Sequence, residues 1–242
     1  LGGRALTTRT GEYALNLGPH ALDLGGAAAR VLRELSVTYA GGAPPVSGGY
    51  ALRAGVRHTL PLGSVSLLTT GLLRPAEKLE AGRFLATVGR LDPAPLAGVS
   101  VADWLARSFA HAGVRELIAA FLRLSTYAHD PARQSAGAAL AQLQLGVRPG
   151  VLYVDGGWQS LVDALRDAAL QAGVRIETRR EAARVEPDGT VVHLQDGGAL
   201  RADAVIVTGS PALAHALVPE SGALAAWAKS AIPVRAACLD VA

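Results

Sequence analysis

The chain contains no methionine and a single cysteine, Cys238, among its 242 residues. One cysteine excludes an intrachain disulfide and a cysteine-rich zinc site. The apolar run around Cys238 favours a buried, unreactive thiol. Without methionine, even at Leu1, the sequence is expected to be a fragment of a longer protein or a processed product. A reducing compartment agrees with this cysteine usage, so we expect a cytoplasmic location, with membrane association left open.

Aromatic residues and lysines are also scarce. Aromatic residues make up 5% of the chain, and 21 of the 23 basic residues are arginines, scattered along the sequence with a net charge of +3. Proteins that bind nucleic acids usually gather basic charge on one face and add aromatic residues that stack on bases. The composition therefore argues against nucleic acid as a partner.

Several catalytic and metal-binding motifs are missing. The sequence has no GxSxG, no HExxH, no histidine pair at i, i+4 and no Walker A lysine motif. Asp155 stands beside two glycines, and we interpret it as a cap of the following helix rather than as a catalytic acid. The sequence thus nominates no catalytic residue and no metal ligand.

The uncharged run 60–73 is too short to span a bilayer and is interrupted by Pro61. We therefore expect no transmembrane segment, while a peripheral contact with a membrane is left open. The run is interpreted as loop and short elements. The oligomeric state is not predicted.

Half of the residues are apolar and 18% are charged, as in folded globular proteins. The middle of the chain has helical periodicity, with helices expected at 76–90, after a Ser100 cap, and at 136–145. The last third predicts strands at 152–154, 174–178 and 204–207 and a hairpin over 185–194 that turns at Asp188–Gly189. The fold class predicted is α/β, or α+β when the whole chain is considered.

Four segments occur in an informative order: LGGRA (1–5), LNLGPHAL (15–22), VLYVDGGWQSLVDAL (151–165), and the 183–197 hairpin followed by ADAVIVTGSP (202–211). In this order they resemble the superfamily of flavin-dependent amine oxidases, phytoene desaturases and protoporphyrinogen oxidases. The resemblance implies an FAD/NAD(P)-binding-type sheet layer that is split in sequence by an inserted, largely helical substrate domain. It implies an FAD domain over 1–40 and 150–218, and a substrate domain over 41–149 and 219–242.

The resemblance implies FAD as the cofactor and also implies which residues contact it. Glycine lets backbone N–H groups approach a pyrophosphate closely, and an arginine can neutralise its charge. A plain tight turn is the alternative interpretation of the GGR segment, and an ordinary half-buried histidine is the alternative for His20. The segment 208–211 departs from the usual family sequences, so backbone contacts are implied there. The residues implied are Gly2, Gly3, Arg4, Ala5, Gly18, Pro19, His20, Ala182, Thr208, Gly209 and Ser210.

The function implied by the resemblance is an FAD-dependent oxidoreductase that removes a hydride or two electrons from a small organic substrate. An apolar substrate, such as a polyene or a porphyrin-like molecule, is one candidate class. The alternative is a non-catalytic α/β binding or interaction module. The family's GxGxxG loop and its C-terminal segment over the flavin do not occur in these residues. We therefore expect the chain alone to bind FAD poorly. An in-frame GxGxxG upstream of Leu1 would favour the enzyme.

Overall fold

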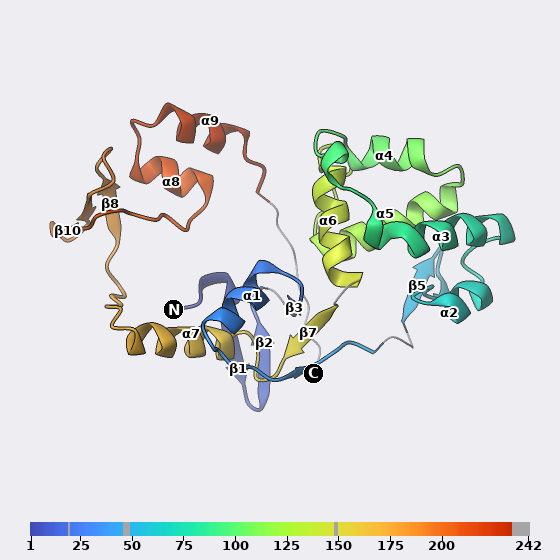
Figure 1. Ribbon diagram of the computed structural model, residues 1–242, viewed down its shortest axis with the longest axis horizontal. Helices are drawn as coiled ribbons and strands as arrows, with labels where there is room; N and C mark the ends of the chain where they lie inside the picture. The colour runs from blue at the N-terminus through green and yellow to red at the C-terminus, as the bar shows by residue number, and fades with distance from the viewer. Residues whose placement is uncertain (19, 46–48, 148–149, 234–242) are drawn as a thin grey trace. The chain divides into compact units, whose positions relative to one another are not determined.

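The computed structural model describes residues 1–18, 20–45, 49–147 and 150–233 (Figure 1). Its mixture of helices and strands confirms the predicted fold class. The chain divides into two compact units, one over Leu1–Gln171 and another that begins at Ala172. Cys238 lies outside the described residues.

The first unit begins with a short 3₁₀ turn, η1 (Gly3–Ala5), and an antiparallel hairpin of β1 (Thr7–Thr10) and β2 (Tyr13–Asn16). A second sheet has the order β3-β7-β4, with β3 at Ala21–Asp23, β7 at Val151–Val154 and β4 at Gly41–Gly42. Both pairings of β7 are antiparallel. The strand predicted at 152–154 is therefore confirmed, and it pairs with strands from the beginning of the chain.

Two helices of the first unit share a core with this sheet. They are α1 (Ala27–Glu34) and α7 (Gln159–Gln171). Leu22 on β3 packs with Ala29 and Leu32 of α1 and with Leu161 of α7. The three-residue spacing of Ala29 and Leu32 places both on one face of α1, and this face is buried. The sheet is thus held by apolar packing as well as by its few ladder hydrogen bonds.

The middle of the chain is largely helical, as predicted. Its hairpin consists of β5 (Tyr50–Arg53) and β6 (Val56–Thr59), and its helices are α2 (Ser64–Thr69), α3 (Pro75–Thr87), α4 (Val101–Ser108), α5 (Ala112–Thr126) and α6 (Ala136–Val147), with the 3₁₀ turns η2 (Val88–Arg90) and η3 (Ala94–Leu96). The predicted helix at 76–90 therefore continues as 3₁₀ turn after Thr87.

The core of this helical part forms around α5 and a cluster of three aromatic rings. Val114 and Ile118, which lie four residues apart on α5, are both fully buried. The rings of Phe84, Trp104 and Phe109 meet edge to face, with centroids 5.2–6.1 Å apart. Such pairs contribute about 0.5–1.5 kcal/mol each beyond their buried area. These contacts join α3 and α4 to the loop that precedes α5.

Ser100 caps α4 as predicted. Its hydroxyl oxygen accepts the N–H of Asp103 at 3.0 Å and donates to the Asp103 carboxylate at 2.8 Å. This arrangement satisfies one of the N–H groups that the first turn of a helix leaves without an intrahelical acceptor.

The second unit contains a three-stranded antiparallel sheet and two helices. The sheet has the order β10-β9-β8, from β8 (Ala182–Val185), β9 (Val191–Leu194) and β10 (Ala199–Arg201), and the helices are α8 (Pro211–Leu217) and α9 (Gly222–Ser230). The predicted turn at Asp188–Gly189 is confirmed. The N–H and hydroxyl of Thr190 both donate to the Asp188 carboxylate and lower its pKa below the usual value.

Two predicted strands of the second unit are wrong. Within the described residues, neither 174–178 nor 204–207 pairs with another strand. Val174 is 50% exposed and Ile206 is 87% exposed. An apolar β-branched run becomes a strand only when its backbone finds a hydrogen-bonding neighbour, and these two runs have none here.

Glu80 ties α3 to the loop between α4 and α5. Its carboxylate accepts the N–H groups of Ala110 and His111 at 2.7 and 3.2 Å, and it lies 2.8 Å from Nδ1 of the His111 ring. Desolvation raises the pKa of Glu80, but these hydrogen bonds outweigh it and bring the pKa below its ordinary value. The ionised form is therefore favoured in the folded state.

We expect Glu80→Gln to lower the free energy of unfolding by about 1 kcal/mol at pH 7, because two hydrogen bonds to a charged acceptor become neutral. A lowered folded-state pKa stabilises above the unfolded value of about 4.3 and loses this effect as pH falls through the folded value. The difference from wild type should therefore shrink below about pH 4 in urea titrations. Glu34→Gln, at an exposed and distant ion pair, is the near-neutral control. A deficit that is independent of pH would contradict this account.

Candidate cofactor site

The predicted GGR segment forms an exposed turn in which some backbone N–H groups are not used by hydrogen bonds. Gly2 and Gly3 have φ angles of 117° and 50°, which glycine adopts without strain. The turn closes with hydrogen bonds from Ala5 N to Gly2 O at 2.8 Å and from Leu6 N to Gly3 O at 3.2 Å. The N–H groups of Gly3 and Arg4 have no acceptor in the part of the chain that the structure describes. Successive free N–H groups of this kind suit an anionic oxygen.

Gly18 lies directly against this turn. A Cβ atom at position 18 would stand 2.1 Å from the carbonyl oxygen of Arg4, and the N–H of Leu17 donates to the carbonyl of Leu6 at 2.9 Å. The hairpin of β1 and β2 therefore brings together the two predicted segments LGGRA and LNLGPHAL. His20 follows, half-buried, immediately before β3. Pro19 lies outside the described residues.

The N-terminus of α7 is capped by the same hairpin. Asn16 Oδ1 accepts the N–H of Trp158 at 3.0 Å, and Thr7 Oγ1 accepts the N–H of Gln159 at 3.1 Å. The Thr7 hydroxyl also donates to Asn16 Oδ1 at 2.7 Å. The backbone at Gly157 approaches so closely that a Cβ there would lie 2.6 Å from Thr7 Oγ1. The first turn of α7 is thus satisfied by side chains from the start of the chain.

The prediction that Asp155 caps α7 is wrong. Asn16 and Thr7 occupy the capping positions, and within the described residues Asp155 contributes only its backbone oxygen, which accepts from the Ser160 hydroxyl at 3.4 Å. Sequence reasoning favoured Asp155 because it lies near the helix start. The only signal for the true caps is the presence of small polar residues in otherwise strand-like segments.

Gln159 provides an unpartnered buried acceptor beside the turn. Its Nε2 donates to Asp163 Oδ1 at 3.0 Å, while its Oε1 is buried without a hydrogen-bond partner within the described residues. This oxygen would lie 3.4 Å from a Cβ placed on Gly2. A buried acceptor without a donor costs about 1–3 kcal/mol. A donor supplied by a bound molecule at the turn would remove that cost.

The remaining predicted residues belong to the second unit, on neighbouring elements. Ala182 begins β8 and pairs with Leu194, next to an irregularity in the ladder. Thr208 and Gly209 precede α8, which packs against β8. The Ser210 hydroxyl accepts the N–H of Leu213 at 3.2 Å and so caps α8. The Ser210 hydroxyl is therefore used within the fold.

In the described residues, no group of three or more histidine, cysteine, aspartate or glutamate side chains gathers as metal ligands would. None of the helices there combines the length and the apolar character that a membrane crossing needs.

The sequence matches the model of the family of flavin-containing amine oxidoreductases over residues 1–236. The chain belongs to this family. The predicted family is thus confirmed, and a flavin cofactor, FAD, is confirmed with it at the level of the family. Among curated proteins, none matches the chain.

Solved structures share the fold at low sequence identity. A protein from Pyrococcus furiosus aligns with a TM-score of 0.68 and 17% identity over 96% of this chain and 57% of its own. An oxidoreductase from Methanosarcina mazei aligns with a TM-score of 0.70 and 17% identity over 93% of this chain and 56% of its own. Rab GDI from Plasmodium falciparum aligns with a TM-score of 0.51 and 14% identity over 79% of this chain and 49% of its own. The chain thus spans little more than half the length of the first two structures.

We expect Gly18→Ala to destabilise the first unit by about 3 kcal/mol, because the added methyl group would overlap the Arg4 carbonyl and force the turn away from β2. Denaturant unfolding measures the change. Gly89→Ala is the control, since a Cβ there meets nothing within 4 Å. Equal effects of the two substitutions would show that the turn does not pack against Gly18.

Asn16→Ala should lower the free energy of unfolding by about 1–2 kcal/mol, since the N–H of Trp158 and the Thr7 hydroxyl both lose their acceptor. Asn16→Asp keeps an acceptor at the same place and should recover most of the loss. The comparison is made by chemical denaturation. If Asn16→Asp were as unstable as Asn16→Ala, the capping role would be excluded.

Proposed function

We propose that the protein is an FAD-dependent oxidoreductase that removes a hydride or two electrons from a small organic substrate. The observation that carries this proposal is the turn at Gly2–Ala5. It offers two free N–H groups and a positive side chain at one place, and Gly18 fixes its position. These features suit the negatively charged part of a flavin dinucleotide. Family membership over residues 1–236 supports the same cofactor.

The residues divide the binding of FAD between them. Gly3 and Arg4 would donate to phosphate or flavin oxygens, and His20 would lie beside the flavin ring. The backbone at Ala182 and at 208–210 would contact the adenosine half. Bound FAD supplies the acceptor for a hydride or an electron pair. The protein's part is to hold the cofactor, orient the substrate and exclude water, so we assign no catalytic acid or base.

The helical part of the first unit is proposed as the substrate domain. It has its own extensive apolar core, and it is inserted between strands that pair in one sheet, β3 and β4 with β7. An apolar substrate, such as a polyene or a porphyrin-like molecule, is the class that we propose.

A non-catalytic binding module is the second candidate. The similarity to Rab GDI, a protein not described as an oxidoreductase, favours keeping it, because one fold can serve unrelated functions. The visible spectrum of the purified full-length protein separates the two. Absorbance of an oxidised flavin that bleaches on reduction supports the oxidoreductase. A folded, colourless protein that takes up no added FAD supports the binding module.

Arg4→Gln should weaken FAD binding by the full-length protein about tenfold, because a charge-assisted hydrogen bond to an anionic group is lost. Titration of the deflavinated protein with FAD, followed by flavin fluorescence, measures the change. Arg9→Gln removes the same charge from an exposed site on the same hairpin and is the control. Equal affinities of the two variants would contradict the role of Arg4.

A further inference from the structure

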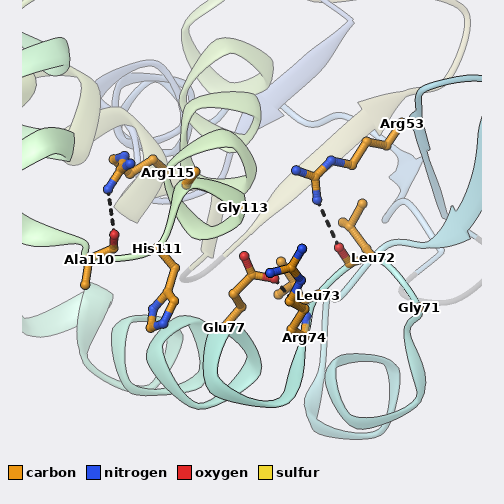
Figure 2. A pocket seen from close by; sticks show the side chains of 11 residues that line it. Arg53, Gly71, Leu72, Leu73, Arg74, Glu77, Ala110, His111, Gly113 and Arg115 are labelled. Atoms are coloured by element: carbon orange, nitrogen blue, oxygen red, sulfur yellow. Dashed lines mark hydrogen bonds between the residues drawn. The ribbon is translucent and has the colours of Figure 1, made fainter.

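A pocket in the helical part of the first unit is lined by three arginines. Its volume is about 580 Å³, within the range of ~300–1,000 Å³ of small-molecule sites. Arg53 reaches it from β5, Arg74 from the start of α3, and Arg115 from the first turns of α5. Figure 2 shows the side chains of Arg53, Arg74 and Glu77 directed toward the middle of the pocket. None of these residues belongs to the predicted cofactor site.

The single carboxylate that lines the pocket, Glu77, has a structural role. Glu77 is 9% exposed, and its Oε2 accepts the N–H of Arg74 at 2.8 Å, which caps α3. Its Oε1 lies against Gly113 at the start of α5, where an added Cβ would be 2.6 Å away. Glu77 therefore neutralises part of the charge, but it cannot move to a guanidinium without giving up the cap. Because Glu116, outside the lining, pairs with Arg53, the three arginines face two carboxylates, which leaves the pocket positive by one charge.

The three arginines differ in what holds them. Arg115 donates to the carbonyls of Phe109 and Ala110 at 2.7 and 2.9 Å, so it has a structural role (Figure 2). Arg53 donates to the Leu72 carbonyl at 3.3 Å and pairs with the exposed Glu116 at 2.9 Å. The Arg74 guanidinium has no hydrogen-bond or ion-pair partner among the described residues. It is exposed and available.

We propose that this pocket binds a small organic anion, through a carboxylate or phosphate group held between Arg53 and Arg74. A guanidinium binds either group through parallel hydrogen bonds, and Arg53 is already fixed in place by the Leu72 carbonyl. The exposed pair with Glu116 is weak, so Arg53 can exchange it for a ligand. Arg115 adds positive charge without having to move. The pocket shares no residue with the predicted cofactor site, so the proposal extends beyond the proposed redox function.

The experiment uses isothermal titration calorimetry of the full-length protein with two probes, succinate and inorganic phosphate, at constant ionic strength because salt screens such sites. We expect saturable binding of at least one probe. Binding of succinate alone assigns a carboxylate ligand, binding of phosphate alone assigns a phosphate ester, and binding of both assigns a general anion site. Failure of both probes to saturate overturns the proposal.

Three variants locate the site. Arg74→Gln should weaken binding about tenfold, because its guanidinium is the unpaired one and its backbone cap with Glu77 is kept. Glu116→Gln should tighten binding about twofold to fivefold by releasing Arg53, an effect that loss of structure cannot produce. Arg107→Gln, exposed on α4 and outside the pocket, should leave affinity unchanged. Equal weakening by Arg107→Gln and Arg74→Gln, or no tightening by Glu116→Gln, overturns the proposal.

Discussion

The first turn of α7 depends on two side chains from the other end of its unit. Asn16 and Thr7 accept the N–H groups of Trp158 and Gln159, and they can do so only because Gly157 lets the backbone come within contact distance. This junction fixes the hairpin of β1 and β2 against α7. The hairpin in turn sets the distance between Gly18 and the turn at Gly2–Ala5. The geometry of the proposed cofactor site therefore follows from a capping interaction.

The glycines around this junction differ in how much space surrounds them. Gly18 and Gly157 are constrained by close approach of backbone or side-chain atoms, whereas a Cβ on Gly3 would meet nothing within 4 Å. This open space is where we propose that the ligand binds. Packing thus requires glycine at Gly18, whereas at Gly3 the space beside the same turn is open.

Much of the local structure could be predicted from the sequence. Ser100 before an apolar stripe predicts its own cap, and Asp188–Gly189 predicts its hairpin, because both depend on residues within four positions. The strands predicted around Val174 and Ile206 were wrong, because a strand also needs a hydrogen-bonding neighbour, which the local sequence pattern does not reveal. The same limit explains why the predicted capping role of Asp155 was wrong. The residues that cap α7 are distant in sequence, and nothing near Trp158 indicates them. The meeting of Gly18 with the Arg4 carbonyl was not predicted, because spacing alone does not show which turns touch.

Asn16 and Trp158 are 142 residues apart, which bears on how the protein is made. At synthesis rates of ~5–20 residues per second, the hairpin must wait on the order of ten seconds before α7 leaves the ribosome. During that interval the helical part between them is complete and can fold on its own local contacts, while Thr7 and Asn16 remain in water. Long-range closure is also slower than local folding. The turn proposed to hold the cofactor is therefore expected to be among the last parts of the first unit to become rigid during synthesis.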